Sequence, residues 1–428
     1  MMDRDIASKH VDVTVDAPVA TDPAACAADI GQTSAQSRKT PAPSEATQSD
    51  SPRATRYTTS RTFRTALWLH RWTGLIAAPF FLILCITGTI LIFHHEIDEA
   101  LGQDAHVEAP APGTPERPLA EIVTAAQATA PDRRPLGMVF DADHPERVMV
   151  ALVPANERGF DAAQFVTMDV FRGTPVASVD PRWTPTGLVL RLHANWFLDL
   201  PGELIGGVIA VLVVVCLVSG IVVYGPFIKG LALGEVRRKR GRRLQQRDLH
   251  NLFGTIALGW TLLVGATGIA LALGNIALKV WQGTELQRLA AAYAREAPIA
   301  SGHASLDAAR AAAEAARPGW RTTFILFPGS DFSTVRHYTI LLVGPVGLQK
   351  RLFEIALVDA VDARVDEITQ LPWYLVVTQM SQPLHFGDYG GLPLKLFWAG
   401  CAWLALFITA NGAWLWWARR PRKRSRAA

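Results

Sequence analysis

Residues 248–268 read DLHNLFGTIALGWTLLVGATG, and residues 68–88 read WLHRWTGLIAAPFFLILCITG. Both stretches fit the pattern L-H-x3-G-x12-T-G without a gap, although the apolar residues between the shared positions differ freely. Five positions in register indicate an internal duplication, with a requirement for one histidine and two glycines in each copy. The shared residues are Leu69, His70, Gly74, Thr87 and Gly88 in the first copy and Leu249, His250, Gly254, Thr267 and Gly268 in the second.

Both stretches lie inside long apolar runs. Hydrophobic residues make up 50% of the 428-residue chain, the mean hydropathy is positive, and the apolar residues are clustered. A hydrocarbon core of about 30 Å takes roughly 20 residues of helix. Four runs are long enough, and they predict four transmembrane helices at about 66–93, 204–228, 252–274 and 395–418.

The basic residues predict the orientation of these helices, because arginines and lysines beside a span are retained on the cytoplasmic side. They gather before the first span, between the second and third, and after the fourth, at 53–71, 237–247 and 419–426. We therefore expect a multi-pass protein of a bacterial inner membrane with both termini in the cytoplasm. The net charge of +4 is the sum of basic cytoplasmic segments and outer segments of mixed charge. It does not predict a nucleic-acid partner, and the partner expected from composition is the lipid bilayer.

The two long segments between spans are expected to be periplasmic α+β domains. In the first, PLAEIVTAAQATA predicts a helix entered through Pro118, followed by strands. In the second, SLDAARAAAEAARPGW predicts a helix capped by Ser305, again followed by strands. The expected fold class is an all-α four-helix transmembrane bundle with two α+β inserts, in the order span, insert, span, repeated once.

The expected boundaries follow from these assignments. The segments are a disordered cytoplasmic tail at 1–60, the first transmembrane helix at 61–97, the first periplasmic domain at 98–190, the second transmembrane helix with its periplasmic lead-in at 191–228, a basic cytoplasmic loop at 229–248, the third transmembrane helix at 249–278, the second periplasmic domain at 279–383, the fourth transmembrane helix with its lead-in at 384–418, and a basic cytoplasmic tail at 419–428.

The repeated histidines need an explanation beyond packing. On an ideal helix Gly74 lies one turn from His70, and Gly88 lies five turns on, back on the same face. Glycines often let membrane helices pack closely, but ionisable residues in spans are costly and usually face a bundle interior, a partner or a cofactor. One imidazole from each of two facing helices suits the axial ligation of haem iron. Zinc would be expected to add cysteine or carboxylate ligands at short spacing, and none is near His70 or His250.

A second pair of histidines stands at the outer ends of spans two and four. His193 lies in RLHANWFLDLPG and His385 in PLHFGDYGGLP. They are candidates for a second haem site. The proline and glycines that follow them prevent a prediction of the helix face on which they lie, so the sequence is compatible with either one haem b or two. His94 and His95 lie at the same level without counterparts in the second copy, and for them an interfacial or substrate-side role is as open as ligation.

The motifs LHRWTGLI, ITGTIL, LHNLFG and GATG, with the two inserts, resemble the PepSY-associated transmembrane helix family, which includes iron-regulated membrane proteins and inner-membrane ferric-siderophore reductases. The resemblance covers about 60–420. VTMDVFRGTPV and IALVDAVDARV stand where PepSY domains carry a closing V-D-x-x-T-G-x-V strand, although the first scrambles that pattern and the second lacks its glycine.

The resemblance implies a haem-b oxidoreductase that passes electrons across the inner membrane to ferric siderophores or other ferric chelates. It implies iron ligation by His70, His193, His250 and His385, beside Gly74, Gly88, Gly254 and Gly268. The chain carries no flavin module, so electrons would come from a separate cytoplasmic protein or from quinol. Two other classes stay open: a PepSY-type binding or regulatory protein, and a metal or proton transporter lined by histidines. No catalytic residue is assigned.

Overall fold

The structure is a computed structural model. It describes residues 60–103, 107, 111, 113–141, 144–160, 162–177, 183–228, 236–293 and 304–418. The predicted tails at 1–60, apart from Ser60, and at 419–428 lie outside the described residues, as does the 229–235 part of the predicted central loop.

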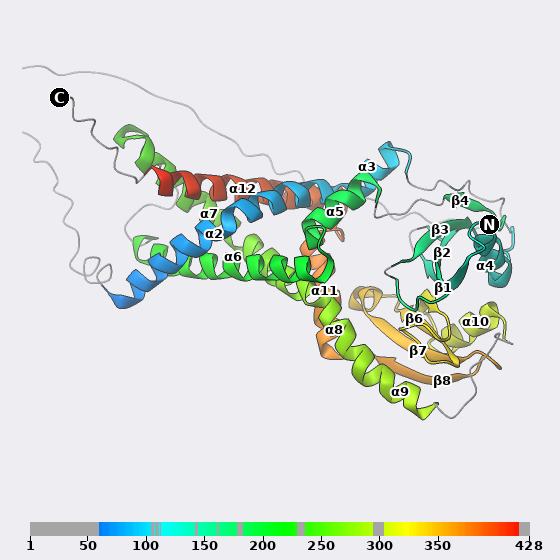
Figure 1. Ribbon diagram of the computed structural model, residues 1–428. Helices are drawn as coiled ribbons and strands as arrows, with labels where there is room; N and C mark the ends of the chain where they lie inside the picture. The colour runs from blue at the N-terminus through cyan, green and yellow to red at the C-terminus, as the bar shows by residue number, and fades with distance from the viewer. Residues whose placement is uncertain are drawn as a thin grey trace, which may run out of the picture. The chain divides into compact units, whose positions relative to one another are not determined.

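Four long apolar helices form a bundle (Figure 1). They are α2 (Arg61–Ile92), α6 (Asp199–Ile228), α7 (Arg242–Ala272) and α12 (Gly391–Trp417). Within the described residues these four are long and apolar enough to cross a membrane, as predicted. Helices α2 and α7 each pack against both α6 and α12, so the two helices that carry the repeated motif face one another across the bundle.

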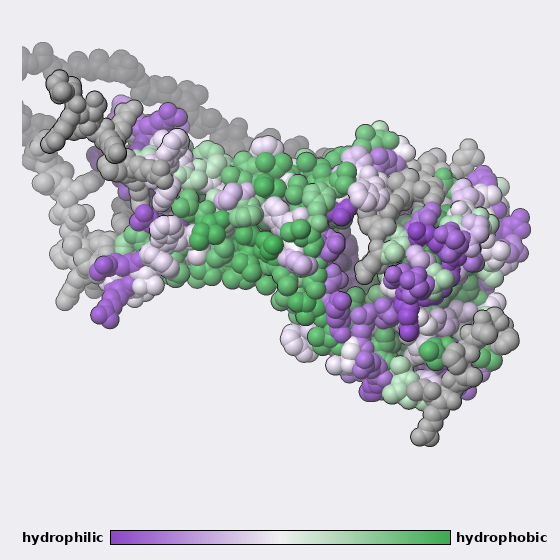
Figure 2. Space-filling model, viewed as in Figure 1, coloured by the Kyte–Doolittle hydropathy of each residue, from purple (hydrophilic) through white to green (hydrophobic). Residues whose placement is uncertain are grey.

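The outer surface of the bundle is apolar. Large hydrophobic side chains such as Ile76, Val208 and Trp403 are 52%, 60% and 59% exposed. Figure 2 shows hydrophobic residues gathered over the four helices, whereas hydrophilic residues gather around the strands. A soluble protein rarely exposes so much contiguous apolar surface, and the chain is therefore a membrane protein.

The two motif helices begin and end at recognisable points. Ser60 caps α2 by accepting a hydrogen bond from the Phe63 N–H at 3.2 Å. Helix α2 breaks at Phe93 before α3 (His94–Ala100), and α7 breaks at the matched Leu273 before α8 (Gly274–Trp281). Helix α7 starts at Arg242, inside the stretch predicted as loop, because Arg, Leu and Gln are good helix formers.

Two short helices precede α6 and α12. Helix α5 (Pro185–Asn195) lies against α2, and α11 (Trp373–Phe386) lies against α7. Each ends in a left-handed residue, Trp196 with φ of 53° and Gly387 with φ of 68°. These turns separate the short helices from the long ones, so each places its last residues beside a span without belonging to one.

All eight strands form one antiparallel sheet. They are β1 (Arg133–Phe140), β2 (Arg147–Pro154), β3 (Gln164–Asp169), β4 (Pro175–Ala177), β5 (Arg321–Leu326), β6 (His337–Val343), β7 (Phe353–Asp359) and β8 (Val365–Gln370). Their order in the sheet is β4-β3-β2-β1-β5-β6-β7-β8. The first four strands come from the first insert and the last four from the second, so the inserts are not separate domains with separate sheets.

The joint between the inserts is the β1–β5 pair. Met138 pairs with Ile325, and Gly137 pairs with Leu326. A Cβ on Gly137 would lie 2.6 Å from the Ile325 carbonyl oxygen, so only glycine allows this approach. Helices α4 (Leu119–Ala128) and α10 (Leu306–Ala316) cover one hydrophobic core that draws buried residues from both inserts.

Helix starts in the sheet region agree with the sequence patterns. Pro118 precedes α4 as its N-cap, and Ser305 caps α10 by accepting from the Ala308 N–H at 3.0 Å. The two helices are tied together by Asp307, whose carboxylate accepts the Leu119 N–H at 3.1 Å. This bond crosses from one insert to the other and supports the joint.

Candidate functional site

The four histidines that the sequence singled out form two facing pairs. His70 of α2 and His250 of α7 have ring centres 6.2 Å apart with planes at 78°; we call them the inner pair. His193 of α5 and His385 of α11 have ring centres 6.3 Å apart with planes at 70°; we call them the outer pair. Each pair takes one histidine from each half of the chain.

This spacing fits a metal held between two imidazoles. Two metal–nitrogen bonds of about 2 Å, plus about 1 Å from each nitrogen to its ring centre, put the ring centres about 6 Å apart. Imidazoles in direct contact through a hydrogen bond or a stack would be closer. Both pairs therefore have the separation that axial ligation of one iron requires.

Every histidine of the two pairs lies against a glycine on another helix. A Cβ on Gly220 would lie 3.0 Å from His70 Nδ1, and one on Gly412 would lie 3.2 Å from His250 Cε1. The outer pair repeats this arrangement, with 3.2 Å between a Gly88 Cβ and His193 Cε1 and 3.3 Å between a Gly268 Cβ and His385 Cε1. Any larger residue at these four positions would push its imidazole out of place.

The glycines of the repeated motif therefore act differently from the interpretation based on helix phase alone. Gly88 and Gly268 lie under the outer pair, not beside the histidine of their own helix. The Cβ position of Gly74 faces Cys216 Sγ at 3.0 Å, and that of Gly254 has no heavy atom within 4 Å. Gly74 thus allows close helix packing, and Gly254 leaves open space next to the inner pair.

Hydrogen bonds at Nδ1 orient the imidazoles. In the inner pair, His70 Nδ1 lies 2.8 Å from the Cys216 carbonyl oxygen. In the outer pair, His193 Nδ1 lies 2.8 Å from Thr87 Oγ1 and His385 Nδ1 lies 3.1 Å from Thr267 Oγ1. A carbonyl oxygen only accepts, so it selects the Nδ1–H tautomer of His70 and leaves its Nε2 lone pair for a metal.

His250 is the exception among the four. Its Nδ1 is buried and has no hydrogen-bond partner within the described residues. A buried polar atom without a partner is costly.

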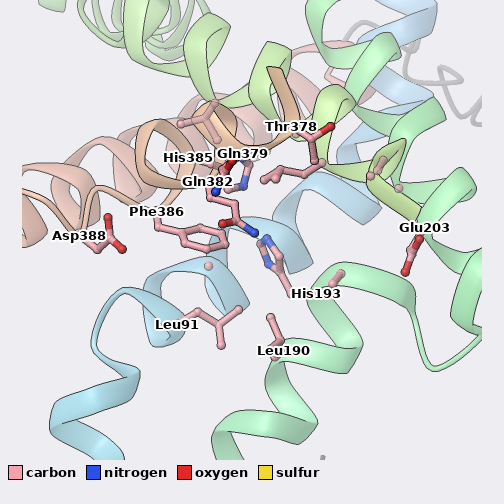
Figure 3. A pocket seen from close by; sticks show the side chains of 18 of the residues that line it. Leu91, Leu190, His193, Glu203, Thr378, Gln379, Gln382, His385, Phe386 and Asp388 are labelled. Atoms are coloured by element: carbon pink, nitrogen blue, oxygen red, sulfur yellow. The ribbon is translucent and has the colours of Figure 1, made fainter. Parts of the chain in front are cut away.

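A cavity of about 840 Å³ opens beside the outer pair. His193, His385, Gly88 and Gly268 line it, together with apolar residues of the long helices. Figure 3 shows both histidines in this cavity, with Gln382 beside them. The cavity continues to the face of the sheet that carries Phe324, Leu341 and Phe353, so it connects the outer pair with the strands.

His94 and His95 also line this cavity but belong to neither pair. Their ring centres lie 4.0 Å apart, and His94 Nδ1 lies 2.8 Å from the Leu91 carbonyl oxygen. Further polar residues line the cavity. Lys395 donates to Glu96 at 2.6 Å, and Asn275 donates to Glu203 at 2.7 Å.

A separate polar cluster lies in the sheet. His337, Asp359 and Asp366 bring three ligand-type atoms within 4.8 Å. Burial alone would raise the pKa of Asp359, but hydrogen bonds from the Val361 N–H and the Arg336 guanidinium hold that pKa below its ordinary value. Both carboxylates have guanidinium partners and both nitrogens of His337 are hydrogen-bonded, so this cluster is a structural ion-pair network.

Comparison with known proteins identifies the family. The sequence profile of the PepSY-associated TM region matches residues 67–419. The chain belongs to this family. The PepSY-associated protein also resembles an uncharacterized protein, PA4219, of Pseudomonas aeruginosa, with 34% identity over 89 residues. That match covers 21% of this chain and 22% of the relative's length.

Sequence reasoning missed several groups at this site. It assigned no role to Gly220 and Gly412, although each lies against an inner histidine. Thr87 and Thr267 were part of the repeated motif but had no role. Their shared position directly before the glycine was the signal that could have found them.

Proposed function

We propose that this protein is an inner-membrane haem-b electron-transfer protein with two haems, which reduces ferric siderophores or other ferric chelates on the periplasmic side. The observation that carries the proposal is the presence of two histidine pairs, each at the spacing of two axial ligands and at different depths of one bundle. Gly88, which seats the outer pair, is five helical turns, or about 27 Å, beyond His70 along α2.

The residues of the chain would hold the cofactors in position. Haem, when bound, supplies at each site an iron that changes its oxidation state by one electron. His70 and His250 would ligate one iron, and His193 and His385 the other. The four glycines leave room for the imidazoles, and the apolar side chains of the long helices exclude water from both sites.

The cavity at the outer pair supports a substrate site on the sheet side. The β1–β5 pair joins the two inserts directly, so no substrate site is proposed between them. The space lies instead between the sheet face and the bundle, next to His193 and His385. Reduction of Fe(III) to Fe(II) weakens its binding to hard oxygen ligands, so a chelate reduced there would release its iron.

The electron donor would act at the opposite end of the bundle. Helix α7 begins at Arg242, at the end of the bundle where basic residues are found. Basic residues beside a span indicate the cytoplasmic side. The inner pair is nearer to this end. We propose a cytoplasmic reductant protein or membrane quinol as the donor, with both termini of the chain in the cytoplasm.

The test is a reduced-minus-oxidised absorption spectrum of the purified full-length protein, with haem measured per chain. We expect low-spin b-type bands and two haems. His70→Ala or His250→Ala should remove one haem, and His193→Ala or His385→Ala should remove the other. The matched control is His144→Ala, which changes a partly exposed histidine of the sheet region and should keep both haems.

Full haem retention in all four alanine variants would overturn the assignment. Absence of haem in protein made with ample haem supply would favour a PepSY-type binding or regulatory protein. Reduction of a ferric chelate by dithionite-reduced protein, followed as loss of the reduced bands, tests the second half of the proposal. No oxidation by any ferric chelate would leave an electron carrier with another acceptor.

A further inference from the structure

We propose that Thr87 and Thr267 are positioning residues for the outer pair, and that they tune the reduction potential of the outer haem. This inference rests on the proposed function, because it concerns histidines that hold haem iron. It assigns a role to the threonine of the repeated T-G motif.

The two threonines have the same bonding. Thr87 Oγ1 donates to the Ile83 carbonyl at 2.8 Å and lies 2.8 Å from His193 Nδ1. Thr267 Oγ1 donates to the Leu263 carbonyl at 2.8 Å and lies 3.1 Å from His385 Nδ1. Both threonines are buried, with 6% and 7% exposure.

The direction of these bonds fixes the state of the imidazoles. A hydroxyl has one hydrogen, and in both threonines the hydrogen is used on the carbonyl one turn back. The oxygen can then only accept from the histidine, so Nδ1 carries the proton and Nε2 keeps its lone pair. The threonine thus selects the tautomer that can ligate iron.

Threonine and the following glycine act together. Gly88 lies under the ring of His193, and Thr87 holds its Nδ1; Gly268 and Thr267 do the same for His385. The T-G pair of each long helix therefore contacts and orients a histidine from a neighbouring short helix. This explains why two adjacent positions recur while the apolar residues around them vary.

The inner pair has a different acceptor. His70 Nδ1 bonds to the peptide carbonyl of Cys216. His250 Nδ1 has no hydrogen-bond partner within the described residues, so hydroxyl acceptors belong to the outer pair. A hydrogen bond from Nδ1 makes the ligating nitrogen more basic, which stabilises the oxidised metal and lowers the potential. Each threonine hydroxyl therefore lowers the potential of the outer haem, and its removal should raise that potential.

The experiment is a spectroscopic redox titration of the full-length protein carrying Thr87→Val, Thr267→Val or both. Valine keeps the volume and removes the acceptor. We expect two haems per chain and an upward shift of one step alone, the step that His193→Ala or His385→Ala removes, by threefold to tenfold in the reduction equilibrium; tenfold is about 59 mV for one electron. Serine at both positions should restore the wild-type potentials.

The matched control is Thr409→Val in α12. Thr409 also donates to the carbonyl one turn back, that of Ala405 at 2.8 Å, and the site described above does not use it. The reduction potentials of both haems should be the same in the Thr409→Val variant as in the wild type. Unchanged potentials in the double valine variant with both haems bound would overturn the inference and leave the haem assignment intact.

The alanine variants of the outer pair identify the step that belongs to the outer haem, because His193→Ala and His385→Ala should abolish the same one of the two wild-type steps. If the valine variants lose the outer haem, the serine variants should keep it, since serine restores the acceptor. Loss of that haem in the serine variants as well would overturn the inference. A wild-type protein without haem would overturn the proposed function itself, and this inference with it.

Discussion

The two halves of the chain meet twice, and they meet in opposite ways. In the sheet, β1 and β5 join backbone to backbone, and the two inserts share one core. In the bundle, the halves present histidines whose ring centres stay 6.2 and 6.3 Å apart. Glycines beside all four rings, and hydrogen bonds at three of the Nδ1 atoms, maintain these openings between the histidines.

The largest expected effect comes from filling one opening without touching the joint. Gly88→Leu places a side chain where His193 lies, since even its Cβ would be 3.2 Å from the ring, and we expect loss of about half of the bound haem. Gly220→Leu should remove the other half through His70. Haem per chain and the redox titration measure both.

The control for this pair is Gly400→Leu in α12, whose Cβ position has no neighbour within 4 Å. It should keep both haems. If Gly88→Leu and Gly220→Leu removed the same haem, the glycines would not serve separate pairs, and the comparison between the openings and the joint would lose its basis.

A smaller effect is expected from opening the joint. Gly137→Ala puts a Cβ 2.6 Å from the Ile325 carbonyl oxygen, and the strain should cost about 1–3 kcal/mol. Hydrogen exchange at β1 and β5 should accelerate, while the haem spectrum stays as in the wild type. The control is Gly159→Ala, whose Cβ would have an ordinary contact at 3.4 Å. It should change neither the hydrogen exchange of β1 and β5 nor the haem spectrum.

The smallest effect is expected from acid. Because burial alone would raise the pKa of Asp359 but its hydrogen bonds lower it overall, the folded-state pKa lies below the unfolded value of about 3.9. This stabilisation is present above that value and is lost as pH falls through the folded pKa. The protection factors of the β7 amides, which correct for the intrinsic exchange rate, should fall below about pH 4, and Asp359→Asn should weaken this dependence.

Asp132→Asn, at an exposed position, is the control for the acid experiment and should leave the dependence unchanged. We expect haem to stay bound at the pH at which β7 loses protection from hydrogen exchange. Loss of haem at a higher pH would contradict this expectation.

The spans could be predicted because their signal is local. Length and composition define a membrane helix, and the structure has four such helices where the sequence predicted them. The helix caps at Pro118 and Ser305 are also local and were correctly placed. The facing of His70 and His250 followed from their matched positions on two helices of one bundle.

The joint and the outer pair could not be predicted in the same way. Alternation in a strand shows which face is buried, but not which strand lies beside it, so nothing in RRPLGMVF indicates a partner in the second insert. The position of His193 and His385 depends on the turns at Trp196 and Gly387. Helix phase shows the face of Gly88, but not that an imidazole from another helix covers it.

The β1–β5 joint also limits what the bundle can transport. Transporters move solutes by rocking one half of the molecule against the other, so that a central site opens to each side in turn. Here the first half carries one side of an eight-stranded sheet and the second half carries the other. Rocking the halves apart at the sheet end would break the hydrogen bonds between β1 and β5, so this joint opposes alternating access by such a motion.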